Sequence, residues 1–129
     1  AWNLVPGIRA IDTLLDEDRA LRGVLRECHP ELCFWALNGG RAMQHSKRQA
    51  AGRQERLAVL GRELPRCRAL FEQACGRFRR RDVARDDIID ALACALTAKL
   101  GYGAYRTLPS EPPRDRRGLP MEIVYCRPR

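Results

Sequence analysis

The residues with the most distinctive chemistry lie in one stretch of the chain, from Glu27 to Lys47. Glu27, His29 and Glu31 come first, and a glycine pair and then a lysine follow. The short apolar run before Glu27 predicts a strand, and Pro30 suits the first turn of a helix. Open α/β sheets gather their functional groups where a strand ends and a helix begins. We therefore expect Glu27, His29 and Glu31 to be site residues.

A second set of acids lies in a helix-forming stretch further along the chain. Asp90 follows Asp87 by three residues and Asp86 by four, so it shares a helix face with either of them. Acids at a helix start also act as caps, which explains Asp86 and Asp87 better than Asp90. Together with Glu27 or Glu31, these acids would form an oxygen-rich site suited to magnesium or manganese. Two such ions can promote phosphodiester cleavage.

Other catalytic arrangements have less support in the sequence. Only His29 and His45 could offer imidazole to zinc, and neither lies in a metal-ligand spacing. Cys28 beside His29, or Ser46 beside His45, could pair a nucleophile with a base, but adjacent residues do not point at each other. The six cysteines form no Cys-x-x-Cys pair and most have apolar neighbours, so we expect reduced, buried thiols.

Helices and two strands are expected to position these groups. The apolar spacing predicts helices over 6–21, 30–37, 46–64, 65–79 and 83–99. Strands are expected over 24–28 and 121–125, and the proline-rich segment 107–119 is expected to be a surface loop. Asn38, Gly39 and Gly40 should end the second helix, Ser46 should cap the third, and Gly52 should weaken it. We expect one α/β domain over residues 1–129.

Composition favours a globular protein that is attracted to polyanions. Hydrophobic residues make up 45% of the 129 residues and charged residues 31%, which argues against wholesale disorder. No apolar run is long enough to span a bilayer and no signal-peptide pattern is present, so we expect a cytoplasmic location. The net charge of +8 favours nucleic acid as a partner. A basic cluster over 77–81 would either complement a helix dipole or contact phosphates.

Several of these blocks, in the same order, resemble the family called domain of unknown function 429, whose members are described as predicted nucleases of the ribonuclease H fold. The matching segments are 27–31 with Phe34, 37–40, Ser46 and Lys47, Gly52, Arg56, 86–93 with 97–98, and 118–122. The resemblance implies the helix-rich C-terminal portion of a ribonuclease H-like α/β fold, with few strands. Family members begin with a strand that bears a catalytic-type aspartate, and we expect those upstream strands to be missing from this chain.

The resemblance also implies roles for individual residues. Glu27, Asp87 and Asp90 would bind a magnesium or manganese ion. Glu31 would support them as a further catalytic residue, and it is also the alternative to Glu27 for the acid at the end of the fourth strand. The residues expected to bind the substrate, with phosphate at the lysine, are Lys47, His29, Asn38 and Arg56. The substrate would be DNA or RNA.

Two alternatives remain beside this nuclease hypothesis. In one, the chain is a non-catalytic nucleic-acid-binding or protein-interaction module that keeps the fold. In the other, the acids only cap helices and bind the glycine loop. Exposed strand edges would also favour a homo-oligomer.

Overall fold

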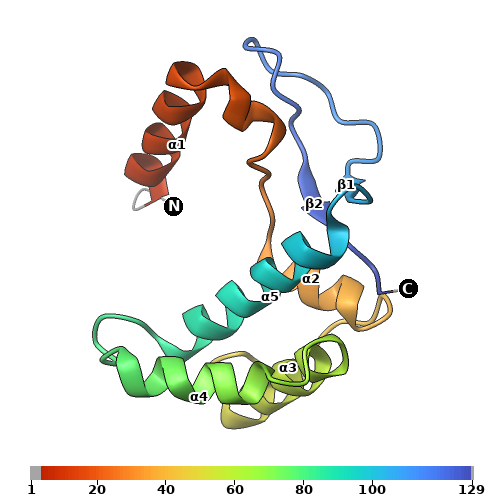
Figure 1. Ribbon diagram of the computed structural model, residues 1–129. Coiled ribbons are helices and arrows are strands. Elements are labelled where there is room, and N and C mark those ends of the chain that lie inside the picture. Colours follow the sequence, from red (N-terminus) through yellow and green to blue (C-terminus); the bar gives the residue numbers. More distant parts are fainter. Residues whose placement is uncertain (1–3, 129) are drawn as a thin grey trace.

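The computed structural model describes residues 4–128 and shows a helix-rich chain with two short strands (Figure 1). The first three residues and the last residue of the expected domain lie outside this description. Within residues 4–128, none of the helices combines the length and the apolar character that crossing a bilayer requires. The elements, in chain order, are α1 (Val5–Glu17), the 3₁₀-helix η2 (Arg19–Gly23), α2 (Pro30–Leu37), α3 (Ala50–Glu63), α4 (Cys67–Arg77), α5 (Arg85–Gly101), β1 (Arg106–Leu108) and β2 (Ile123–Tyr125).

Helix α5 is the centre of the helical body, because it packs against α2, α3 and α4 (Figure 1). Phe34 from α2, Leu60 from α3 and Ile89 from α5 are among the fully buried side chains of this core. Burying a side chain of that size contributes roughly 1.5–3 kcal/mol. The predicted helices over 30–37, 46–64, 65–79 and 83–99 are therefore confirmed as elements, with differences at their ends.

Both the start and the end of α2 follow directly from its sequence. Pro30 occupies the first turn, where its missing N–H costs nothing. Gly39 and Gly40 adopt positive φ angles of 70° and 82°, and the Gly40 N–H donates to the carbonyl of Trp35 at 2.8 Å. This is the glycine-dependent way of satisfying the last carbonyls of a helix. The predicted stop after Leu37 is confirmed.

The start of α3 differs from the prediction. Ser46 is not the N-cap, because α3 begins at Ala50 and Gln49 precedes it as the cap residue. Instead, the Ser46 carbonyl accepts a turn hydrogen bond from Gln49 N at 3.0 Å. A Cβ added to Gly52 would lie 2.0 Å from that same carbonyl oxygen. Gly52 thus permits the preceding loop to lie against the first turn of α3, which is a reason for glycine that the helix pattern alone did not show.

The predicted strand over 24–28 is wrong. The segment between η2 and α2 is irregular and mostly exposed, and one hydrogen bond, from Val124 N to Glu27 O at 2.8 Å, connects its backbone to β2. A single bond does not form a ladder. Strand β2 pairs instead with β1, antiparallel, with Thr107 opposite Val124. The predicted final strand is confirmed over its last three residues, whereas part of the predicted surface loop belongs to β1.

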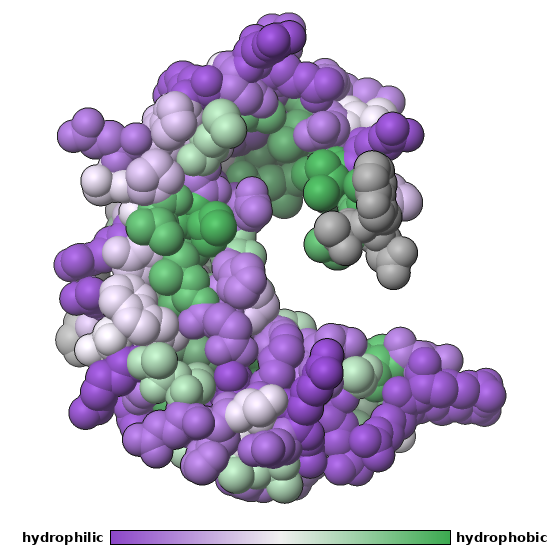
Figure 2. Space-filling view, turned by 180° about the vertical axis from the view of Figure 1, so that it is seen from behind, coloured by the Kyte–Doolittle hydropathy of each residue, from purple (hydrophilic) through white to green (hydrophobic). Residues whose placement is uncertain are grey.

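The apolar face of α1 has no cover among the described residues. The predicted helix over 6–21 exists as α1 followed by η2, but no residue of α1 is buried. Ile8, Ile11 and Leu14 are exposed, and the helix packs mainly on η2. In the space-filling view the molecule curves round an open hollow with apolar side chains on its wall (Figure 2). Asp16 of α1 is exposed and pairs with Arg117 of the proline-rich loop at 3.0 Å.

Candidate functional site

Lys47 and Asp90 form the centre of the candidate site. The loop before α3 carries Lys47, and its ammonium donates to Asp90 Oδ2 on α5 at 2.6 Å. Only 14% of the Asp90 side chain is exposed. The hydrogen bond to Asp90 raises the pKa of Lys47, and the charges of Asp90, Asp86 and Glu31 act in the same direction. Lys47 thus contacts Asp90 and also feels the charges of two further carboxylates.

A second ion pair links α2 to α3. Arg56 donates from Nη2 to both carboxylate oxygens of Glu31 at 2.9 Å, and its Nη1 donates to the carbonyls of His45 and Gly52. The guanidinium also lies over the ring of Phe34, 5.4 Å from its centroid. Arg56 is buried, whereas 42% of the Glu31 side chain is exposed. Arg56 thus orients Glu31 while Glu31 keeps an open side.

The loop that carries Lys47 is fixed by Glu55. The two oxygens of this carboxylate accept the backbone N–H groups of Gln44 at 2.7 Å and His45 at 3.0 Å. These bonds lower the pKa of Glu55, because they stabilise its charged form. With the Arg56 bond to the His45 carbonyl, they hold the backbone on both sides of His45. Lys47 therefore reaches Asp90 from a positioned backbone.

One oxygen of Asp90 has no hydrogen-bond partner. Asp90 Oδ1 is buried from solvent and receives no donor, although Oδ2 of the same carboxylate binds Lys47. A buried charged oxygen without a partner costs free energy in a medium of low dielectric constant. Its chemistry fits a hard cation or a ligand donor. Among the described acids, Asp90 is thus the one with a buried oxygen that lacks a hydrogen-bond partner.

The other predicted site residues are more dispersed. Asp87 accepts the Ala84 N–H at 3.3 Å at the start of α5, which is a capping role. Glu27 and His29 are exposed in and after the irregular segment. Among the described residues, three potential ligand atoms of acids, histidines or cysteines come within 4.8 Å of one another only at a cysteine group, so Glu27, Asp87 and Asp90 do not form such a set. Metal binding by these acids stays a prediction.

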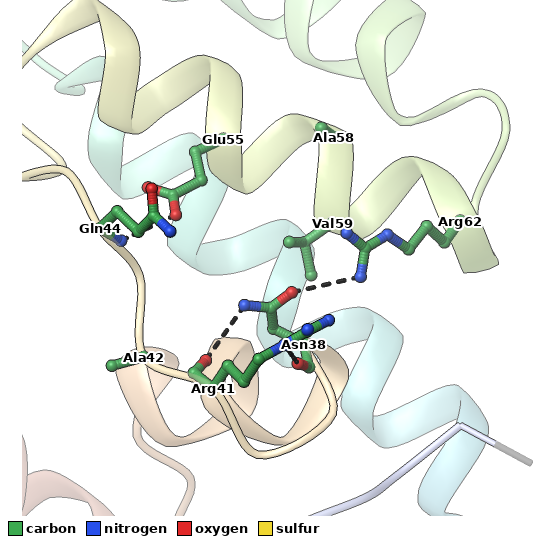
Figure 3. Close-up of a pocket in the computed structure, with 8 residues that line it drawn as sticks. All are labelled: Asn38, Arg41, Ala42, Gln44, Glu55, Ala58, Val59 and Arg62. Carbon is green, nitrogen blue, oxygen red and sulfur yellow. Dashed lines mark hydrogen bonds between the residues drawn. The ribbon is translucent and has the colours of Figure 1, made fainter.

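Asn38 lies in a shallow polar pocket beside the site, of about 310 Å³ (Figure 3). Its amide donates to the carbonyl of Arg41 at 3.1 Å and accepts from Arg62 at 3.2 Å, so the two arginines stand on either side of it. Glu55 and Gln44 line the other end of the pocket. The pocket has a basic wall at the end of α2. The side-chain hydrogen bonds of Asn38 thus involve Arg41 and Arg62 and neither Lys47 nor Asp90.

Three cysteines of α2, α5 and the segment before α2 converge, and sequence reasoning missed them. The sulfur atoms of Cys28, Cys33 and Cys94 lie within 4.8 Å of one another. Interaction with the Cys94 thiol lowers the pKa of Cys33 to about 6, whereas the hydrogen bond to Cys33 raises that of Cys94. Burial raises the pKa of Cys28. No spacing rule finds this group, because Cys94 comes from α5 and the other two from around the start of α2.

Comparison with known proteins gives one result. The model of the family described as "Protein of unknown function (DUF429)" matches residues 1–114. Neither the search of curated proteins nor that of solved structures found a match.

Proposed function

We propose, from the premise that the chain belongs to the DUF429 family, that it acts on nucleic acid as a metal-dependent nuclease of the ribonuclease H-like type. The observation that supports this proposal best is the buried, unpartnered Oδ1 of Asp90 beside the Lys47 ammonium. Glu31 and Asp86 add negative charge at the same place. A phosphodiester hydrolase needs such a combination of carboxylates for a cation and basic groups for phosphate.

The donor set fits one hard cation better than two. Asp90 would hold magnesium or manganese through Oδ1, with Glu31 as the neighbouring carboxylate. Glu27 and Asp87, which the sequence predicts as further ligands, do not converge with Asp90 among the described residues and would have to move to join it. When bound, such an ion would activate water and stabilise the leaving oxygen. Oxygen ligands of this kind are those that both ions prefer.

Basic residues of the chain would bind the phosphate backbone. Lys47 is more than one third exposed, so its ammonium can contact a substrate phosphate while it orients Asp90. Arg56 is buried, and both of its Nη atoms donate hydrogen bonds within the chain, so its proposed role is to hold Glu31 in place. The exposed arginines that follow α4 add a basic surface beside the helical body. That distribution, with a net charge of +8, suits a polyanion.

The proposal is tested by calorimetry and a cleavage assay on the same proteins. We expect manganese binding to the wild type, and metal-dependent cleavage of labelled single- or double-stranded DNA or RNA. Asp90→Asn should lower both the manganese affinity and the cleavage rate at least tenfold. Replacing a residue that only supports a metal ligand typically lowers metal affinity or activity by about 10–100-fold, and a ligand should contribute at least as much. Asp82→Asn is the matched control, because Asp82 is exposed and pairs loosely with its neighbour Arg81 at 3.6 Å. Cleavage that persists in EDTA, or in Asp90→Asn, would count against the nuclease.

A second candidate is a non-catalytic module that binds nucleic acid. It is favoured by the two ion pairs, because Lys47 and Arg56 already neutralise Asp90 and Glu31 within the chain. In that case we expect binding without turnover and a steep fall in affinity with salt. Replacing Arg79, Arg80 and Arg81 by glutamine should flatten the salt dependence by about 2–3 in log-log slope. An unchanged slope would remove this surface from the proposal.

A further inference from the structure

The group formed by Cys28, Cys33 and Cys94 lies where three parts of the chain meet. Cys28 ends the irregular segment before α2, Cys33 lies within α2, and Cys94 lies on α5. Their sulfur atoms are all within 4.8 Å of one another. Cys33 has no exposed surface, and the other two are half-buried. The group is thus anchored in the core on one side and accessible on the other.

The thiols face one another and do not simply fill apolar space. Each of the three takes part in thiol–thiol interactions with the other two. Thr97, one turn after Cys94 on α5, has a buried hydroxyl oxygen without a hydrogen bond of good geometry, and it lies close to Cys33 and Cys126. A buried polar group that is poorly satisfied is unusual in a core. A charged thiolate group would give that hydroxyl an acceptor.

We propose that Cys28, Cys33 and Cys94 bind one thiophilic metal ion of the zinc(II) or copper(I) class. Thiolate ligands select these ions over magnesium, calcium or manganese. In a tetrahedral zinc site with bonds of about 2.3 Å, neighbouring sulfurs are about 3.8 Å apart, so an approach of at most about 1 Å would complete the geometry. This site is distinct from the acids of the proposed nuclease centre and does not depend on that function.

The coordination number distinguishes the two ions. Among the described residues no fourth acid, histidine or cysteine joins the group. Zinc would therefore need a water molecule or an external ligand in its fourth position, as in sites that keep one position open. Copper(I) would be satisfied by the three sulfurs alone. Access through the half-buried Cys28 and Cys94 is compatible with either.

The test uses the full chain, purified under a reducing agent without oxygen. Cobalt(II) is the first probe, because thiolate ligation produces an intense charge-transfer absorbance in the near ultraviolet. We expect one cobalt per chain, displaced by one equivalent of zinc. A parallel competition with a copper(I)-specific chelator measures the second ion. Tighter retention of copper(I) than of zinc would assign the site to copper, and the reverse would assign it to zinc.

Variants separate metal ligation from general thiol binding. Cys28→Ser and Cys94→Ser should each weaken cobalt binding at least 100-fold. Replacing residues that only support metal ligands lowers metal affinity by up to about 100-fold, so the loss of a ligand itself should be at least as large. Cys75→Ser is the matched control, because Cys75 is a half-buried cysteine of α4 outside the group. Circular dichroism checks that each variant is folded, and Cys28 lies outside any helix, so its replacement spares helical packing. No charge-transfer band and no retention of either ion would overturn the proposal, as would equal binding by Cys28→Ser and the wild type.

Discussion

Replacing Lys47 tests whether one ion pair holds the loop before α3 against α5. Removing one partner of a buried ion pair costs about 3–5 kcal/mol, because the other charge stays buried without compensation. More than one third of the Lys47 side chain is exposed, so water would partly solvate the Asp90 carboxylate left behind. We therefore expect Lys47→Met to lower the free energy of unfolding by about 2–3 kcal/mol. The loss exceeds that of an exposed pair because Asp90 Oδ1 already lacks a donor.

A double-mutant cycle isolates the interaction. Asp90→Asn should cost only about 1 kcal/mol, because the freed ammonium can turn toward water. With Asp90 already neutral, Lys47→Met should add little, so the double variant should resemble Asp90→Asn. The expected coupling free energy between the two positions is then about 2–3 kcal/mol. Neighbours in contact show couplings of this size, whereas distant positions do not.

The assay is urea unfolding followed by tryptophan fluorescence, in EDTA so that no added cation occupies Asp90. The control is the same cycle at Arg81 and Asp82, an exposed pair 3.6 Å apart that also removes one positive and one negative charge. Its coupling should stay below about 0.5 kcal/mol. A coupling at Lys47 and Asp90 no larger than that of the control would refute the assignment of a structural role to this pair.

Three further perturbations follow from the same region. In urea unfolding, Gly52→Ala should destabilise the protein by more than about 2 kcal/mol, because the added Cβ would lie 2.0 Å from a backbone oxygen. Gly61→Ala in the same helix is the control and should be neutral or stabilising, because the nearest atom to its added Cβ is 3.7 Å away. The folded-state pKa of Glu55 is below its ordinary value of 4.5, so its stabilisation is present above that pH and disappears as the pH falls through the folded pKa. Glu55→Gln should therefore lower the unfolding midpoint at neutral pH and approach the wild type as the pH falls through the folded pKa, and an equal deficit across that range would contradict this. Arg56→Lys should lose the contact with both oxygens of Glu31 and lower the free energy of unfolding by about 2–3 kcal/mol, measured by thermal unfolding. A loss below about 0.5 kcal/mol would contradict this expectation.

The helices could be predicted because their signals are local. Apolar spacing, Pro30 and the Asn38-Gly39-Gly40 stop all act within one or two turns, and α2 ends where they indicate. The strand predicted over 24–28 failed because a strand needs a partner, and sequence pattern does not say which backbone lies beside it. The same limit applies to α1, whose periodic apolar residues correctly indicate a helix but do not show what covers them.

The candidate site was predictable only where neighbours along a helix were involved. The spacing of Asp86 and Asp90 correctly predicted a shared face, and both charges act on Lys47. The partner itself was not predictable, because the bond from Lys47 to Asp90 joins positions 43 residues apart. Neither was the reason for Gly52, which is a contact with a loop carbonyl. The cysteine group depends in the same way on the packing of α2 against α5.

The two proposed cation sites should influence each other, because α5 carries both. Asp90 and Cys94 are one helical turn apart, and residues so spaced have Cβ atoms about 5–6 Å apart. Three thiolates around zinc carry a net charge of −1, and around copper(I) a net charge of −2, whereas three thiols are neutral. A loaded cysteine site would thus attract a second cation toward Asp90. We expect zinc or copper(I) loading to raise manganese affinity severalfold by calorimetry, and Cys28→Ser to abolish that rise, whereas a decrease on loading would show that the charge at the cysteines has the opposite sign.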